Sequence, residues 1–311
     1  MKYNKKTEVI LTMNILNNCN LCPRECGADR TLSLGYCKAP QNPKLARATL
    51  HFWEEPCISG KNGSGTVFFS GCNLKCVYCQ NHSVSQQAFG KEVTIERLGE
   101  IFLDLQRQGA HNINLVSPTP YIPQIIEAID MVRDKIKIPF VYNTGGYEKP
   151  KTLEMLKGYI DIFLTDIKYK GAEISKKYSG AADYFEVALS AAKKMIELTG
   201  YPQFDSEGIM KSGVIVRHLV HPGGRGDSMD ILREMSAKLP KEGYILSLMS
   251  QYTPDCELLK NFSELCRRIT TFEYNSVVDE AIALGLDKGF MQEKSSAEKK
   301  FTPSFDLEGV E

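Results

Sequence analysis

The sequence feature that most constrains the fold is the alternation of short apolar runs with longer amphipathic segments from residue 66 onward. Short apolar runs rich in β-branched and aromatic residues are typical of buried strands, and the longer segments have helical periodicity. The predicted strands are TVFFSG (66–71), INLVS (113–117), FVYNT (140–144), DIFLTDIK (161–168), GVIVRHLV (213–220) and YILSLM (244–249). The predicted helices include 95–109, 121–136 and 186–200.

Strands that alternate with helices at this spacing predict a parallel sheet with helices on its outside, which is the α/β fold class. Six strand–helix units suit a partial (β/α)6 barrel of the TIM-like kind. In such a barrel the functional side chains gather at the carboxyl ends of the strands. A doubly wound open sheet is the competing architecture, and periodicity alone does not separate the two.

Composition divides the chain into three parts. Residues 1–60 are rich in Cys, Pro, Asn and Gly, which indicates a small metal-binding N-terminal extension, and residues 61–291 form the predicted barrel. Residues 292–311 are polar and charged, and we expect a disordered tail there.

Charge and hydropathy exclude two classes of partner. The 38 Lys and Arg side chains are balanced by 38 Asp and Glu, so neither nucleic acid nor an anionic membrane is an expected partner. The sequence has no apolar run of about 18 residues, the length that a membrane-spanning helix needs. The N-terminus does not have the pattern of a signal peptide, so we expect a cytoplasmic protein.

The chain has ten cysteines, and seven of them fall into two tight groups. In a cytoplasmic protein thiols stay reduced, so clustered cysteines indicate metal binding rather than disulfides. The second group, Cys72, Cys76 and Cys79, directly follows the first predicted strand. Three thiolates suit either a zinc site completed by a distant ligand or a 4Fe–4S cluster with one iron open to a small chelating molecule.

The sequence resembles the radical S-adenosylmethionine (SAM) superfamily, which favours the hypothesis of a 4Fe–4S cluster. The signature of the superfamily is C-x3-C-x-aromatic-C, and it is matched by Cys72, Cys76, Tyr78 and Cys79. The whole chain looks most like uncharacterised homologues of pyruvate formate-lyase activating enzyme. The shared stretches are CNLCPRECG, GYC, HFWEEPCISG, GTVFFSGCNLKCVYCQN, NLVSPTPY, NTGGYE, DIFLTDIKY, VIVRHLVHPGG and LMSQYTP.

This resemblance implies an oxidoreductase-like enzyme with two cofactors, a 4Fe–4S cluster and S-adenosyl-L-methionine. SAM chelates the open iron, and one electron, from a donor such as flavodoxin or ferredoxin, releases a 5′-deoxyadenosyl radical that abstracts a hydrogen atom. The name of the relatives implies a glycine of a partner glycyl-radical enzyme as the hydrogen source. The alternatives are a maturase or small-molecule radical enzyme with an auxiliary cluster, and a non-catalytic iron–sulfur or zinc protein.

The resemblance also assigns residues to the SAM site. Tyr78 would border the adenine, and Arg217, on the fifth predicted strand, would contact the SAM carboxylate or ribose. Superfamily members carry Gly-Gly-Glu after the second strand to hold the SAM amino group. This chain has Ser117-Pro118-Thr119 there, so the hydroxyls of Ser117 and Thr119 are the expected contacts.

Three further residues are predicted at the mouth of the barrel. Asn143 ends the third strand, where the related activases carry an Asp, and Asp166 and Lys168 end the fourth. Strand alternation puts Asp166 and Lys168 on the same face, where they are either SAM contacts or a plain ion pair.

The first cysteine group, Cys19, Cys22, Cys26 and Cys37, supplies enough thiolates to close a tetrahedral site. A structural zinc ion is the first choice and a second iron–sulfur cluster the alternative, because the spacing is not that of bacterial ferredoxins. Of the remaining cysteines, Cys57 is expected to be neither a ligand nor a redox thiol. Cys256 and Cys266 are expected on a helix as buried small hydrophobic residues.

Overall fold

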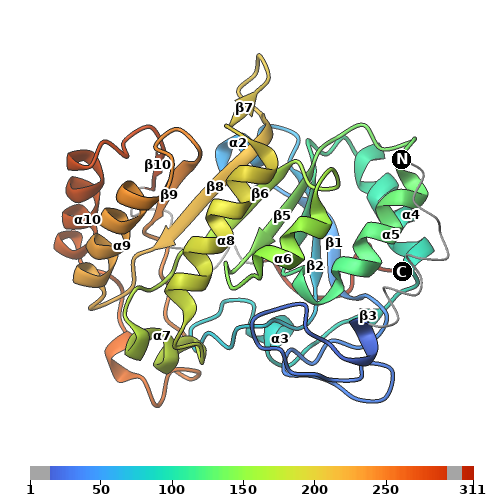
Figure 1. Ribbon diagram of the computed structural model, residues 1–311, viewed down its shortest axis with the longest axis horizontal. Helices are drawn as coiled ribbons and strands as arrows, with labels where there is room; N and C mark the ends of the chain where they lie inside the picture. Colours follow the sequence, from blue (N-terminus) through green and yellow to red (C-terminus); the bar gives the residue numbers. More distant parts are fainter. Residues whose placement is uncertain (1–14, 293–302) are drawn as a thin grey trace.

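The computed structural model describes residues 15–292 and 303–311, and its centre is one ten-stranded sheet (Figure 1). The strands are β1 (Lys44–His51), β2 (Ser64–Phe69), β3 (Lys91–Glu92), β4 (Ile113–Val116), β5 (Phe140–Thr144), β6 (Ile162–Asp166), β7 (Gln203–Phe204), β8 (Met210–Leu219), β9 (Ile245–Met249) and β10 (Phe290–Met291). All six predicted strands are present, as β2, β4, β5, β6, β8 and β9.

The order of the strands decides between the two predicted architectures. Neighbouring strands follow the order β10-β9-β8-β6-β5-β4-β2-β1-β3, and β2, β4, β5, β6, β8, β9 and β10 are parallel. A doubly wound sheet reverses its order at a switch point. The parallel part of this sheet runs through without a reversal, as in a (β/α) barrel. The partial barrel prediction is therefore confirmed, and the open-sheet alternative is wrong.

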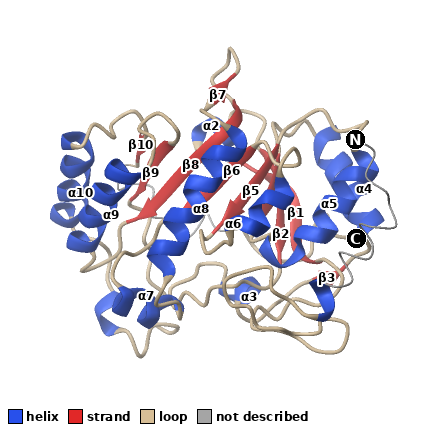
Figure 2. Ribbon diagram, in the orientation of Figure 1, coloured by secondary structure: helices blue, strands red, loops and turns tan. Residues whose placement is uncertain are grey.

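Helices cover one face of the sheet, with α6 and α8 in front of the central strands and α4, α5, α9 and α10 towards its edges (Figures 1 and 2). The helices are α2 (Pro56–Ser59), α3 (His82–Ser85), α4 (Ile95–Arg107), α5 (Ile122–Val132), α6 (Pro150–Leu153), α7 (Ala172–Ser179), α8 (Tyr184–Thr199), α9 (Arg225–Lys238) and α10 (Thr271–Ala283). The short 3-10 helices are η1 (Thr119–Tyr121), η2 (Glu154–Leu156) and η3 (Ser263–Leu265).

The helix α4 shows why the amphipathic segments fold as predicted. Its N-cap Thr94 accepts a hydrogen bond from the backbone N–H of Arg97, which satisfies one of the free N–H groups of the first turn. Leu98, Ile101 and Leu105 recur at helical spacing and are all buried against the sheet.

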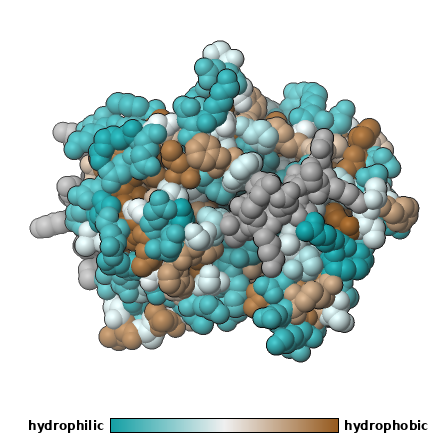
Figure 3. Space-filling view, turned by 180° about the vertical axis from the view of Figure 1, so that it is seen from behind, coloured by the Kyte–Doolittle hydropathy of each residue, from teal (hydrophilic) through white to brown (hydrophobic). Residues whose placement is uncertain are grey.

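The helix α2 packs against the central strands of the sheet. Cys57 and Ile58 pack in one apolar cluster with side chains of three central strands, namely Val141, Ile162, Leu164, Met210 and Ile215. Cys57 is buried among these side chains and does not line the cavity that the other cysteines of the barrel share. From behind, the surface is mainly hydrophilic with small hydrophobic patches (Figure 3).

The strand β1 brings the N-terminal extension and the C-terminal segment 303–311 together at the sheet. This strand lies in the predicted N-terminal extension, yet it pairs antiparallel with β2, so the extension adds a strand to the central sheet. Residues 303–311 follow β1: the backbone N–H of Ala48 donates to Glu308 at 2.9 Å, and the N–H of Leu307 donates to Ala46 at 3.1 Å. Val310 is buried.

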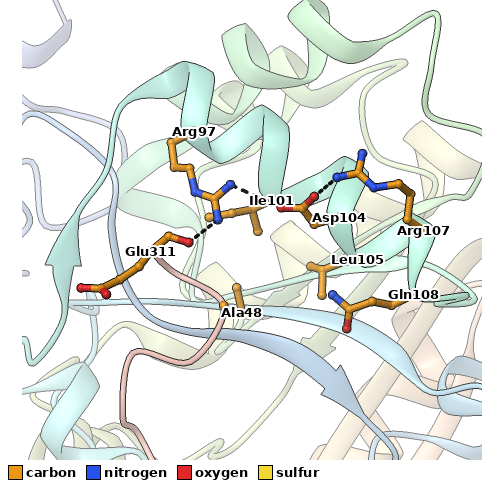
Figure 4. A pocket seen from close by; sticks show the side chains of 9 residues that line it. Ala48, Arg97, Ile101, Asp104, Leu105, Arg107, Gln108 and Glu311 are labelled. Carbon is orange, nitrogen blue, oxygen red and sulfur yellow. Dashed lines mark hydrogen bonds and ion pairs between the residues drawn. The ribbon is translucent and has the colours of Figure 1, made fainter.

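The prediction of a disordered tail is therefore wrong for residues 303–311, while residues 293–302 lie outside the described residues. The physical reason is that apolar side chains lie among the charged ones: Val310 is buried, and the half-buried Phe305 packs against the Phe68 ring with centroids 5.3 Å apart. Arg97 of α4 also donates to the main-chain oxygen of Glu311 at 2.6 Å, beside a surface pocket of about 430 Å³ (Figure 4). In the described chain, no helix is both long and apolar enough to span a bilayer.

Candidate active site

The three-cysteine loop leaves the carboxyl end of β2 and forms one wall of a cavity of about 230 Å³. Cys72, Cys76 and Cys79 all line this cavity. The loop can start here because Gly71 has φ +89° and a Cβ on it would lie 2.4 Å from the main-chain oxygen of Cys37. Any other residue would push the loop away from the N-terminal extension.

Each of the three sulfur atoms accepts one hydrogen bond. The donors are the backbone N–H of Leu74 to Cys72 at 3.4 Å, the hydroxyl of Ser179 to Cys76 at 3.0 Å, and the hydroxyl of Ser85 to Cys79 at 3.4 Å. Donors around cysteine sulfurs tune the potential of iron–sulfur clusters. This chemistry fits thiolates that carry a cluster.

Two of these thiols, Cys72 and Cys76, resist ionisation. Burial raises the pKa of Cys72 and of Cys76, while the ammonium of Lys168 acts in the opposite direction on both. A bound metal centre would reverse this, since coordination removes the thiol proton. Across residues 15–292 and 303–311, no three His, Cys, Asp or Glu side chains are arranged to hold a single metal ion. A four-iron cluster spreads its thiolates over different irons and does not need that arrangement.

The opposite wall of the cavity consists of strand-end side chains. The structure brings six of the predicted SAM residues to this cavity: Tyr78, Ser117, Asn143, Asp166, Lys168 and Arg217. They come from the cluster loop and from β4, β5, β6 and β8 or the residues just beyond them. Their convergence follows from the parallel strand order, because neighbouring carboxyl ends meet at one edge.

Arg217 is the centre of the charged network in this wall. Its Nε donates to Asp166 at 2.8 Å, one Nη to Asn143 at 2.8 Å, and the other Nη to Glu54 at 3.1 Å. Asp166 also accepts from the ammonium of Lys168, so strand alternation did place these two side chains on one face. Burial alone would raise the pKa of Asp166, but Arg217 and Lys168 outweigh it and lower that pKa. Asp166 is therefore held ionised.

Thr119 is the one predicted SAM residue that the structure does not bring to the cavity. The chain turns sharply after β4, with Ser117 at φ +57°, and Thr119 begins η1, where it lines the small cavity of the N-terminal cysteines instead. Its hydroxyl instead donates to Oε1 of Glu148 at 2.5 Å in the protein interior. Thr119 therefore does not lie with the other predicted SAM residues, and the left-handed backbone at Ser117 marks the turn that separates it from them.

The four cysteines of the N-terminal tetrad also lie together in the fold. Cys19, Cys22, Cys26 and Cys37 together line a small cavity of about 20 Å³. Burial raises the pKa of Cys22 to about 12, and the neighbouring thiols Cys37 and Cys19 add to the increase. Within the described residues, the four sulfurs are not arranged to hold one metal ion. The choice between zinc and a second cluster stays a prediction.

Comparison with known proteins identifies the family. Residues 66–235, more than half of the chain, match the sequence profile described as the Radical SAM superfamily. The chain belongs to the radical SAM superfamily. Membership implies a 4Fe–4S cluster and SAM as its cofactors, and the cavity with three thiols lies within the matched region, apart from its far wall at residues 249–253.

Two curated relatives and one solved structure resemble this radical SAM protein. An uncharacterised protein of Methanocaldococcus jannaschii is 28% identical over 289 residues, covering 90% of this chain and 79% of the relative. The pyruvate formate-lyase-activating enzyme of Clostridium pasteurianum is 30% identical over 116 residues, covering 36% of this chain and 48% of that enzyme. The crystal structure of methylornithine synthase (PylB) superposes with a TM-score of 0.52 at 16% identity, over 79% of this chain and 65% of the other. That likeness supports the fold alone.

Sequence reasoning missed two residues of the hydrogen-bond network around Arg217, Glu54 and Asn114, neither of which lines the cluster cavity. Glu54 accepts from Arg217 and, through its other oxygen, from Asn114 at 3.0 Å and Asn143 at 2.8 Å. The available signal was the Glu-Glu-Pro of HFWEEPCISG, two adjacent carboxylates in a segment shared with relatives.

The prediction for Cys256 and Cys266 was wrong in this radical SAM protein. They lie outside the helices of the described chain, Cys256 is exposed, and their sulfurs form a disulfide across ten residues. The segment just before Cys256 borders the cavity: the ring of Tyr252 packs on Tyr78 with centroids 5.6 Å apart, and its hydroxyl donates to the main-chain oxygen of Leu265, inside the bridged loop, at 2.8 Å. Two thiols ten residues apart fit a loop closure better than one helix face.

Proposed function

We propose that Cys72, Cys76 and Cys79 hold the 4Fe–4S cluster and that SAM binds in the cavity of about 230 Å³ beside them. The proposed reaction is hydrogen-atom abstraction. The observation that carries it is that the three thiols share one cavity with five strand-end side chains, Ser117, Asn143, Asp166, Lys168 and Arg217.

The chain's own residues would bind and orient the cofactors. When bound, the cluster and SAM supply a one-electron cleavage that yields the hydrogen-abstracting radical. Arg217 and Lys168, whose charges Asp166 and Glu54 balance, would offer N–H donors to the SAM carboxylate. The Ser117 hydroxyl and the Asn143 amide offer acceptors to the SAM amino group. Tyr78, held between Tyr169 and Tyr252, forms the wall for the adenine.

For the substrate, we propose a glycine of a partner glycyl-radical enzyme. The support is the 30% identity with an activating enzyme over 116 residues. A second candidate is a maturase or small-molecule radical enzyme with an auxiliary cluster. One observation favours it: four thiols of the N-terminal extension line one cavity. A flavodoxin or ferredoxin as electron donor and a cytoplasmic setting belong to the same proposal.

Metal analysis tests the cluster assignment. Iron, sulfide and zinc are measured per chain in protein purified without air, and in a variant with Cys72, Cys76 and Cys79 changed to Ala. The loss of about four irons with one zinc retained supports one cluster and a structural zinc. About eight irons falling to about four assigns a second cluster to the N-terminal tetrad. Cys57→Ala is the matched control and should lose no iron, since Cys57 lies outside both cysteine cavities.

Product analysis tests the reaction. Formation of 5′-deoxyadenosine under a strong reductant distinguishes the enzyme from a non-catalytic metal protein. A glycine-centred EPR doublet in a partner protein would then assign the activase role. Iron bound without any 5′-deoxyadenosine would contradict the enzymatic proposal.

A further inference from the structure

A second, larger cavity adjoins the one that contains the three thiols. Its volume is about 590 Å³, and Met249 and Gln251 line both cavities, so the two share a wall. The segment 52–56 forms one side, and residues 289–292, around β10, form the other. A ligand in this second cavity would therefore lie next to the cluster cavity.

The charges in this cavity are of one sign. Among the described residues that line it, the ionisable ones are Glu54 and Glu55, with no Lys, Arg or His. Glu54 is already satisfied by three donors, Arg217, Asn114 and Asn143. A negatively charged ligand would meet only repulsion from these side chains.

One carboxyl oxygen of Glu55 is available to accept a hydrogen bond from a ligand. Its side chain is only 6% exposed, and Oε1 accepts from the hydroxyl of Ser247 at 2.9 Å. Within the described part of the chain, Oε2 accepts no hydrogen bond and Glu55 forms no ion pair. Burial raises the pKa of Glu55 to about 7, against the opposing effect of Arg217. A donor that reached Oε2 would compensate a buried carboxyl group.

Aromatic rings lie at the rim of the same cavity. Phe52 is 48% and Trp53 61% exposed, and both line it together with Met249 and Met291. The faces of aromatic rings attract cations, and the thioethers accommodate an apolar body. The volume falls within the range of about 300–1,000 Å³ that is typical of small-molecule sites.

We propose that this cavity binds a small-molecule substrate that carries an amine, with Oε2 of Glu55 accepting from the ammonium and Phe52 and Trp53 contacting the rest of the ligand. This rests on the proposed function in one respect, that the substrate lies beside the cluster cavity. It develops the second candidate above, a small-molecule radical enzyme, as the alternative to a glycine of a partner protein.

The chain has a single tryptophan, Trp53, so its fluorescence reports on this cavity alone. The test titrates the protein at pH 8 with phenethylammonium and, separately, with 3-phenylpropionate, which is similar in size and opposite in charge. We expect saturable binding of the amine and at least about tenfold weaker binding of the carboxylate. Equal affinities for the two probes, or no binding of the amine, would overturn the proposal.

Variants locate the charge that is responsible. Glu55→Gln should weaken amine binding by about tenfold or more, and Glu55→Asp should restore part of it. The matched control Glu242→Gln changes a glutamate that is 76% exposed and paired with Lys288, so it should leave the affinity unchanged. Unchanged affinity in Glu55→Gln would contradict the assignment. If Glu55→Gln does not fold, the two probes in the wild-type protein still decide.

The two proposals fail separately. Amine binding without 5′-deoxyadenosine formation would contradict the proposed function and keep the cavity assignment. Cleavage of SAM in a protein that binds neither probe, or binds both equally, would keep the proposed function and reject the cavity assignment.

Discussion

The guanidinium of Arg24 donates to the main-chain oxygen of Asn73 at 2.9 Å, across 49 residues of sequence. Arg24 lies between Cys22 and Cys26 of the N-terminal tetrad, and Asn73 follows Cys72 in the cluster loop. The same guanidinium donates to Ser179 at 3.3 Å, the residue whose hydroxyl contacts Cys76. One side chain thus connects the two cysteine groups, which lie far apart in the sequence.

Changing Arg24 to Ala should loosen the cluster loop. The guanidinium also stacks over the rings of Tyr36 and Tyr147, so its loss removes packing as well as hydrogen bonds. Loss of such outer contacts weakens metal binding by about tenfold or more. We expect iron to be lost to a chelator about tenfold faster than in the wild type.

Lys149→Ala is the control for Arg24. Its ammonium also binds the extension, at the main-chain oxygen of Asn20 and at Glu25, but contacts no residue of the cluster loop. Equal rates of iron loss in the two variants would show that Arg24 only anchors the extension.

Arg217→Ala should both destabilise the protein and abolish SAM binding. It would leave the carboxylates of Asp166 and Glu54 without their shared cation, and their side chains are only 11% and 15% exposed. Breaking a buried pair in this way costs about 3–5 kcal/mol. Arg233→Ala, which removes a half-exposed guanidinium paired with Glu280 and Asp230, should cost less than about 1 kcal/mol.

Denaturant unfolding and equilibrium dialysis with SAM measure the two effects. Arg217→Lys helps to separate them, because it keeps the charge and loses the forked geometry. If Arg217→Ala unfolds no more easily than Arg233→Ala, the buried network does not stabilise the fold as described.

The sequence predicted the barrel and most of the cavity because both depend on local patterns. Strands that end in Asn143, Asp166 and Arg217 are visible as apolar runs, and parallel order then brings their ends together. Glu54 was missed because it lies on a loop after β1 and reaches Arg217 across 163 residues. No periodicity in the sequence reports such a contact.

Two other differences from the predictions have local causes. The backbone at Ser117 has φ +57°, a conformation that a serine in the sequence does not predict. As a result, Thr119 lies outside the cluster cavity. The segment 303–311 has charged neighbours around Phe305, Leu307 and Val310, and its order depends on the partner strand β1 rather than on its own composition.

Glu148 should make stability fall as pH rises. Burial raises the pKa of Glu148 from 4.5 to about 7, although Thr119, Thr144 and Tyr142 donate to it. The folded state therefore favours the protonated carboxyl. Its stabilising effect is complete below about pH 4.5 and is lost as pH rises through about 7.

Glu148→Gln removes this titration. The free energy of unfolding of the wild type, relative to the variant, should decrease by up to about 3 kcal/mol between pH 4.5 and pH 8. Denaturant unfolding at intervals across this range measures it, with Glu242→Gln as an exposed control. A difference that does not change with pH would mean that Glu148 ionises normally.

The disulfide between Cys256 and Cys266 should stabilise the wall that Tyr252 provides for Tyr78. It closes a loop with a sequence separation of ten residues, which in the chain-entropy view contributes about 3 kcal/mol.

Protein denatured without reductant, after removal of bound metal, should show eight free thiols, the eight cysteines outside the bridge. Changing both Cys256 and Cys266 to Ser should lower the free energy of unfolding and speed the loss of iron in air, since it loosens the loop whose Leu265 holds Tyr252 against Tyr78. The single change Lys260→Ala, on an exposed residue within the same loop, serves as the control. Ten free thiols in the wild type, or a double variant that matches Lys260→Ala in both measurements, would contradict this role for the bridge.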